Sequence, residues 1–161
     1  PKQTGIHVPL IVHWPGHIAP SVCGDLVDAS DFVPTLLDLA GQSISEEETL
    51  DGISFAPRLL GRVADTRQTA FFWYDPRPGW DKERFSRHVF ALNKHYKLYR
   101  DGRLFRLTEL PLQEIEIDPA SMTEADQAAK KALAKVIARA MSGVSEPPLV
   151  SAYGEPIRDR P

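Results

Sequence analysis

Apolar residues run almost without interruption from Val8 to Trp14. Because few polar positions alternate with the apolar ones, this run predicts a strand that is buried on both faces. Pro15-Gly16 then ends the strand by turn chemistry. The pattern therefore predicts a core strand near the start of the chain.

The next apolar pattern predicts a helix over residues 31–40. Ser30 is the expected N-cap, Asp31 lies in the first turn where the helix dipole favours a carboxylate, and Gly41 gives the C-terminal stop. A strand followed by a helix indicates an α/β layer in which the helix covers a sheet. The residues expected on the core face of this helix are Phe32, Leu36, Leu39 and Ala40.

Shorter elements follow in the middle of the chain. Phe55–Leu60 predicts one helical turn that Gly61 ends, and Thr69–Tyr74 is β-prone. Asp101-Gly102 is a strong hairpin signal, because a tight turn between strands needs a residue that tolerates positive φ. Three short segments beside it predict an antiparallel set of strands: Arg87–Leu92, Tyr96–Arg100 and Leu104–Leu107.

A long helix is predicted after Pro119. Ser121-x-x-Glu124 has the spacing of a capping box, and Gly143 ends the pattern. The fold class is therefore α/β, in which a mixed α/β sheet is followed by a small antiparallel sheet with a helix. The apolar stripe of this helix is Ala129, Leu133, Val136, Ile137 and Ala140.

Composition adds little to this picture, and charge adds one feature. Hydrophobic residues make up 42% of the chain and charged residues 25%, as in an ordinary globular protein, with a net charge of −3. Residues 77–106 carry nine Lys and Arg against three Asp and Glu, which allows either an anionic ligand or pairing between strands. The single Cys23 allows no internal disulfide, and no apolar run reaches the roughly 20 residues of a membrane span.

The loop YDPRPGW, residues 74–80, is the candidate substrate-binding segment. It combines an acid, an arginine and two aromatic side chains on a proline-rich frame, which suits a sugar ring and an anionic group. The alternative is that Trp73, just before the loop, and the loop aromatics cover the edge of the core. The candidate residues are Tyr74, Asp75, Arg77 and Trp80.

Two blocks of the sequence resemble type I sulfatases. Gly5–Gly41 matches the family segment G-G-I-R-V-P-L-I-V-R-W-P-G … L-V-S-x-x-D-x-x-P-T-L-L-D-L-A-G, and residues 51–61 match D-G-x-S-x-x-P-x-L-x-G. The phrases Y-D-P-R-x-G-x and H-Y-K-L-Y-x-D-G-R-x-F follow further on. The resemblance implies the alkaline-phosphatase-like superfamily and runs from Gly5 to about Arg139.

The resemblance also implies a domain organisation. Residues 1–66 would be the C-terminal end of the sulfatase α/β core, and residues 67–143 a C-terminal subdomain of antiparallel strands plus a helix. Residues 144–161 would form a loosely ordered tail. Since the chain starts at Pro1 without a Met, we expect it to be a piece of a longer protein.

Sulfatases hydrolyse sulfate esters with a formylglycine, made from Cys or Ser in C/S-x-P-x-R, and with a divalent cation, usually calcium. Cys23 is followed by Gly-Asp-Leu-Val and does not fit this pattern. No acidic pair at a strand end and no histidine pair with ligand spacing offers a metal site here. We therefore expect formylglycine and calcium in an N-terminal catalytic part, which is the expected partner, and no activity from this segment alone.

One family residue falls near the start of the chain. Sulfatases have a lysine that contacts sulfate in K-G-x-x-x-E-G-G-x-R-V-P. Lys2 would match it only if about four residues were missing before Gly5, so a surface lysine is the favoured interpretation.

Three functions stay open at this point. The first is a sulfatase acting on a sulfated carbohydrate or an aryl sulfate, and the second is a phosphodiesterase or phosphatase of the same superfamily. The third is a non-catalytic module that binds anionic glycans through the basic region. The resemblance implies a periplasmic or extracellular location, and we expect neither nucleic acid nor a membrane span.

Overall fold

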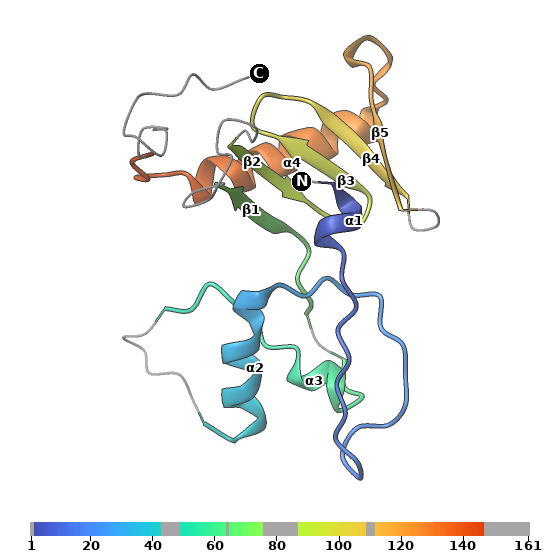
Figure 1. The fold of residues 1–161 in the computed structure, drawn as a ribbon, viewed down its shortest axis with the longest axis vertical. Coiled ribbons are helices and arrows are strands. Elements are labelled where there is room, and N and C mark those ends of the chain that lie inside the picture. Colours follow the sequence, from blue (N-terminus) through green and yellow to red (C-terminus); the bar gives the residue numbers. More distant parts are fainter. Residues whose placement is uncertain (1, 43–48, 64, 76–86, 109–111, 147–161) are drawn as a thin grey trace, which may run out of the picture. The chain divides into compact units, whose positions relative to one another are not determined.

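A computed structural model of the protein describes residues 2–42, 49–63, 65–75, 87–108 and 112–146. The chain forms two compact units, one of residues 1–8 and 71–161 and the other of residues 9–70. Figure 1 labels the helices and strands of both. The domain boundaries predicted at residues 66 and 143 stay predictions.

The first unit is built on a five-stranded sheet in the order β1-β2-β3-β4-β5. From β2 onwards neighbouring strands pair antiparallel, and Gly102 has a φ of +94° in the turn between β3 and β4. The predicted strands and hairpin are confirmed, whereas the last strand was not predicted. The strands are β1 (Ala70–Tyr74), β2 (His88–Leu92), β3 (Tyr96–Tyr99), β4 (Leu104–Thr108) and β5 (Gln113–Glu116).

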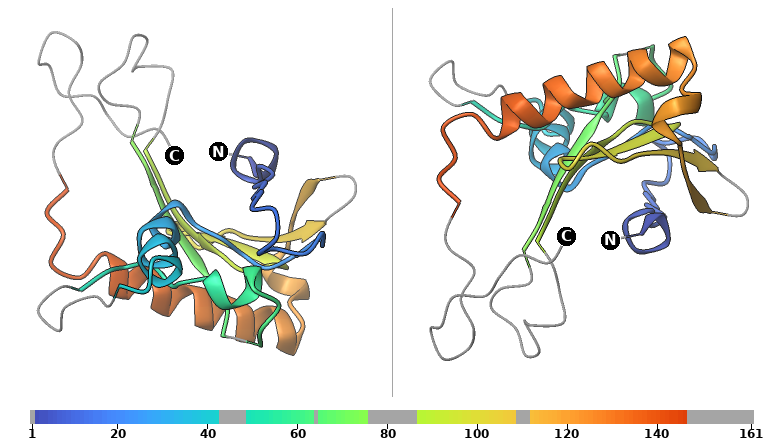
Figure 2. Two further views of the ribbon diagram at one scale, coloured as in Figure 1. Left: turned by 90° about the horizontal axis from the view of Figure 1, so that it is seen from below. Right: turned by 90° about the horizontal axis from the view of Figure 1, so that it is seen from above.

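Helix α4 (Glu124–Ala140) crosses one face of this sheet and packs against β2 and β3, as Figure 2 shows. The predicted apolar stripe is confirmed, because Leu133 and Ile137 are buried and Val136 packs against the same cluster. The interpretation that Trp73 covers the edge of the core is confirmed, because Trp73 packs against the same cluster. The buried residues of this core are Val89, Ala91, Leu98, Leu104, Ile117, Leu133 and Ile137.

The start of α4 differs from the prediction. Thr123 is the N-cap, and it forms a capping box with Asp126. The predicted box at Ser121-x-x-Glu124 is wrong because Ser121 belongs to a short 3₁₀ helix, η3 (Pro119–Ser121), which Asp118 caps. Residues 121–126 contain two overlapping capping patterns, and the second one, Thr123 with Asp126, begins α4.

The other face of the sheet is aromatic and encloses a lysine. Phe72 and Phe90 stack with ring centroids 4.9 Å apart. Lys97 is fully buried, and its Nζ lies 4.4 Å from the Phe90 ring centroid and 2.9 Å from Oε1 of Glu114. The backbone N–H of Gln3, in the unpredicted helix α1 (Gln3–Ile6), donates to the same carboxylate. Glu114 therefore joins the N-terminal helix to β5 and β3.

The second unit contains η1 (Ala29–Asp31), α2 (Phe32–Leu39) and α3 (Ala56–Leu59). The predicted helical turn before Gly61 is confirmed by α3. The predicted N-cap at Ser30 is wrong, because Asp28 is the N-cap and forms a capping box with the side chain of Asp31.

Two further predictions for this part of the chain are wrong. Residues 8–14 form no strand, and the side chains of Val8 and Ile11 are 70% and 86% exposed. In α2, Phe32 and Leu36 are exposed, whereas the helix buries Pro34 and Thr35. A strand forms only beside a hydrogen-bonding neighbour, and none of the described residues pairs with this segment.

Gly52 permits a close backbone approach in this unit. A Cβ built at this position would overlap the carbonyl group of Ser30 and lie 3.0 Å from Cα of Asp31. We expect Gly52→Ala to lower the free energy of unfolding by about 1–3 kcal/mol, as overpacking does. Gly24→Ala is the matched control, since nothing lies within 4 Å of its Cβ position. Equal melting temperatures for the two variants would contradict the expected clash.

Candidate functional site

The sequence candidates Tyr74 and Asp75 lie at one end of the five-stranded sheet. Because the paired strands alternate in direction, the end of β1, the start of β2, the turn after β3 and the end of β5 share this end. Arg77 and Trp80 lie outside the described residues. Lys2 is exposed just before α1. Of the predicted site residues that the structure describes, Tyr74 and Asp75 thus share this end of the sheet.

Asp75 is held by a buried arginine. Nη2 of Arg87 lies 3.1 Å from Oδ2 of Asp75, and its Nη1 lies 3.2 Å from Oε2 of Glu146. The Arg87 side chain is only 4% exposed, and its guanidinium carbon lies 5.8 Å from the Trp73 ring centroid. The Glu146 carboxylate also pairs with Arg100. We call these four residues, Asp75, Arg87, Arg100 and Glu146, the charge clamp.

The clamp lowers the pKa of Glu146. The hydrogen bond from Arg100 is the largest cause, and burial opposes it. The Glu146 carboxylate is therefore ionised at neutral pH and holds both arginines as an anion. Sequence reasoning missed Glu146, which stands 59 positions from Arg87, and no local pattern signals a contact at that separation.

Tyr74 points to a different set of partners. Tyr74 is 38% exposed, and its ring stacks with His88 at a centroid distance of 6.3 Å. His88 in turn meets Tyr99 edge-on at 5.8 Å. Arg103 pairs with Asp101 at 2.8 Å and lies 5.1 Å from the Tyr99 centroid. We call Tyr74, His88 and Tyr99 the aromatic platform.

Two members of the platform, His88 and Tyr99, are uncharged at neutral pH. Burial is the main cause that lowers the pKa of His88, and the nearby positive charge of Arg103 adds to it. Burial also raises the pKa of Tyr99 to about 12. A neutral imidazole beside an exposed phenol ring can stack on an apolar face and exchange hydrogen bonds with hydroxyl groups. Such a surface suits a sugar better than a bare anion.

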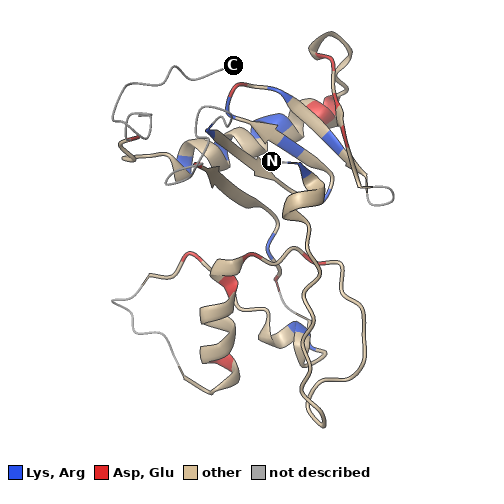
Figure 3. Cartoon of the chain, in the orientation of Figure 1, with Lys and Arg blue, Asp and Glu red and all other residues tan. Residues whose placement is uncertain are grey.

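In the described part of the basic stretch, residues 87–106, five cations pair with carboxylates. Figure 3 shows its arginines and lysines spread over the sheet among acidic residues. Four of the partner carboxylates come from outside residues 77–106, namely Asp75, Glu114, Asp126 and Glu146. Arg87, Lys97, Arg100 and Arg106 pair with these carboxylates, and Arg103 pairs with Asp101 inside the stretch. The pairing interpretation thus accounts for these five described cations.

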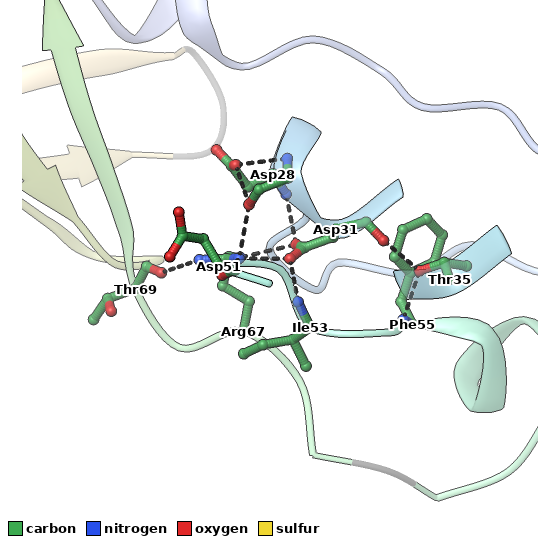
Figure 4. A network of polar contacts seen from close by, with 9 residues as sticks. Asp28, Asp31, Thr35, Asp51, Ile53, Phe55, Arg67 and Thr69 are labelled. Carbon is green, nitrogen blue, oxygen red and sulfur yellow. Dashed lines mark hydrogen bonds and ion pairs between the residues drawn. The ribbon is translucent and has the colours of Figure 1, made fainter. Parts of the chain in front are cut away.

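A second polar cluster surrounds Asp31 in the other unit, as Figure 4 shows. Asp31 is 1% exposed and accepts hydrogen bonds from Arg67 and from the backbone N–H groups of Ile53 and Asp28. Burial would raise its pKa, but these donors outweigh that effect and lower it. Both carboxylate oxygens are occupied, so the arrangement indicates a structural anchor rather than a catalytic acid.

The described residues form no set of side chains that could bind calcium. No group of three His, Cys, Asp or Glu side chains in this part of the chain gathers as cation ligands would. The thiol of Cys23 is exposed and lies 3.3 Å from Oδ2 of Asp25. We derive no step through a metal from these residues.

Comparisons with known proteins point to one family. Residues 2–146 match the family described as N-sulphoglucosamine sulphohydrolase, C-terminal. Arylsulfatase A of Homo sapiens is 44% identical over 71 residues, which cover 44% of this chain and 14% of that protein. An ulvan-active sulfatase of Formosa agariphila is 37% identical over 109 residues, which cover 67% of this chain and 21% of that protein.

One solved structure, a complex with the substrate D-glucosamine-2-N,6-O-disulfate, matches 70% of this chain and 23% of its own at 22% identity and a TM-score of 0.42. Among the residues that the structure describes, no helix combines the length and apolar composition needed to cross a bilayer.

The five-stranded antiparallel sheet with its helix defines a small domain of the mixed α/β class. The chain belongs to the sulfatase C-terminal family, since the family match covers nearly all of it. The resemblance of Gly5–Gly41 to sulfatases is thereby confirmed. The chain spans 14% and 21% of the length of the two curated relatives described above.

Proposed function

We propose that this chain is the C-terminal part of a sulfuric ester hydrolase that acts on a sulfated carbohydrate or an aryl sulfate. The family match over residues 2–146 carries the proposal. The names of the relatives support the substrate class, since they include an arylsulfatase and a sulfatase active on ulvan. The periplasm or the extracellular space is the proposed location.

The chemistry would come from an N-terminal part of the same protein. That part would supply the formylglycine nucleophile and the calcium ligands, so this segment alone would be inactive. The exposed apolar side chains of the second unit support such a partner, because a soluble surface rarely gathers so many. They include Ile11, Val12, Phe32, Val33 and Leu36.

We expect the isolated 161-residue chain to aggregate for the same reason. Residues 8–14 present exposed apolar side chains and a backbone without a strand partner among the described residues, which together favour association between copies. Size-exclusion chromatography with light scattering measures the outcome. A monomeric elution together with a cooperative thermal melt would contradict the need for a partner.

The contribution of this segment to the site would be substrate contact. Tyr74 offers an exposed ring, and Asp75 sits beside it in the charge clamp. Arg77 and Trp80 are proposed contacts that follow directly in the sequence. For Lys2 we propose only a surface position.

The proposal is tested with the longer protein that contains this chain, matured for formylglycine and supplied with calcium. Hydrolysis of p-nitrophenyl sulfate and of a sulfated oligosaccharide is compared with hydrolysis of p-nitrophenyl phosphate and bis-p-nitrophenyl phosphate. Release of sulfate at a higher kcat/KM than release of phosphate is the expected result. Preference for a phosphate ester would assign phosphatase or phosphodiesterase activity, and binding without turnover a non-catalytic module.

A further inference from the structure

The charge clamp and the aromatic platform lie on opposite sides of the same two strand ends. Asp75 follows Tyr74, the last residue of β1, and Arg87 precedes His88, the first residue of β2. Arg87 lies over Trp73, which packs on the core beneath α4, whereas Tyr74 and His88 stack with the aromatic row on the other face. The ion pairs of the charge clamp therefore hold the backbone of Tyr74 and His88 in place, and these residues carry two rings of the platform.

Glu146 closes this clamp from beyond the end of α4. Its carboxylate forms ion pairs with Arg87 and Arg100, so Glu146 joins the start of β2 to the end of β3. Arg87 is almost fully buried, and a buried guanidinium keeps its position only while its carboxylates stay in place. Glu146 itself is far along the chain from Tyr74, and it is linked to the platform through Arg87, which precedes His88, and through Arg100, which follows Tyr99.

We infer that Glu146 is a positioning residue that sets the preference of the enzyme for extended carbohydrate substrates over small aryl sulfates. The inference rests on the proposed function. Stacking of a sugar on the exposed ring of Tyr74 contributes binding free energy only when the ring is held at a defined angle and height. An aryl sulfate has no sugar ring that could stack on the platform, so its binding does not depend on how firmly the Tyr74 ring is held.

The test uses the longer protein and three variants. Glu146→Gln removes the charge but keeps the shape, Glu146→Asp restores a carboxylate, and Glu124→Gln is the matched control at an exposed position of α4. For Glu146→Gln we expect KM for a sulfated oligosaccharide to rise roughly three- to tenfold, the equivalent of one lost aromatic contact. The kcat/KM for p-nitrophenyl sulfate should stay within about twofold, as should both values for the control.

The outcomes separate the inference from the proposed function. Glu146→Asp should recover part of the oligosaccharide KM, which a purely structural role would not require. Equal losses on both substrates, or no loss on either, would overturn the inference while leaving sulfatase activity in place. If the wild type hydrolyses neither substrate, the proposed function fails and equilibrium binding of the oligosaccharide decides the inference. Equal dissociation constants for wild type and Glu146→Gln would then overturn it.

Discussion

Replacing Arg67 by alanine is expected to lower the free energy of unfolding by about 3–5 kcal/mol, the cost of removing one partner from a buried ion pair. The Asp31 side chain is 2% exposed and that of Arg67 13%. Arg67 also donates to the backbone oxygens of Thr69 and Asp51. Its loss therefore leaves a buried carboxylate without its counter-charge and separates three segments of the second unit.

Urea unfolding of the longer protein, followed by hydrogen exchange at the amide of Ile53, measures this effect where it occurs. Ile53 N–H lies 2.7 Å from Oδ1 of Asp31 and loses protection if the anchor opens. Arg58→Ala is the matched control, because Arg58 pairs with Asp25 at a side-chain exposure of 43% and such pairs add little stability. Similar shifts for both variants would contradict the anchoring role of Arg67.

Leu133→Ala is expected to lower the free energy of unfolding by about 2–5 kcal/mol, as for other fully buried leucines. Leu133 is 0% exposed and lies at the centre of the cluster between α4 and the sheet. The measurement is the urea midpoint and slope of the longer protein. Leu133→Met keeps the volume and should cost less than about 1.5 kcal/mol. An equal loss for both substitutions would contradict tight packing at this position.

The sequence predicted the first unit better than the second, because neighbouring residues in the sequence determine most of the elements of the first unit. The β3–β4 hairpin has Asp101-Gly102 at its turn, and α4 has a regular apolar stripe, so neighbouring residues suffice to predict both. β5 escaped prediction because Gln113–Glu116 is mostly polar, as befits the edge strand that it forms. Its place depends on pairing with β4, which short-range patterns do not encode.

The wrong predictions share a dependence on distant partners. Val8–Trp14 has the composition of a buried strand, but the described residues offer it no neighbour, and its side chains are exposed. In α2, Thr35 is buried in place of Leu36 because its hydroxyl accepts from the backbone N–H of Phe55. A tertiary hydrogen bond thus decides which face of the helix turns inward.

The candidate site was predictable only in part. Aromatic and charged residues around a proline-rich loop pointed to Tyr74 and Asp75, and both lie at the loop end of the sheet. The roles of Arg87 and Glu146 depend on the fold that brings them together across the strand ends. Charge counting along the sequence left an anionic ligand and pairing between strands open. The fold pairs Arg87, Lys97, Arg100 and Arg106 with carboxylates from other segments, which charge counting does not identify.

We propose that this chain completes a sulfatase whose nucleophile and metal lie in an N-terminal part. Ion chromatography measures sulfate release from the N-terminal part alone, from this chain alone, and from both in one polypeptide. We expect sulfate release only from the joined protein, with each part alone at the level of the buffer. Sulfate release by the 161-residue chain alone, or full activity of the N-terminal part without it, would overturn this proposal.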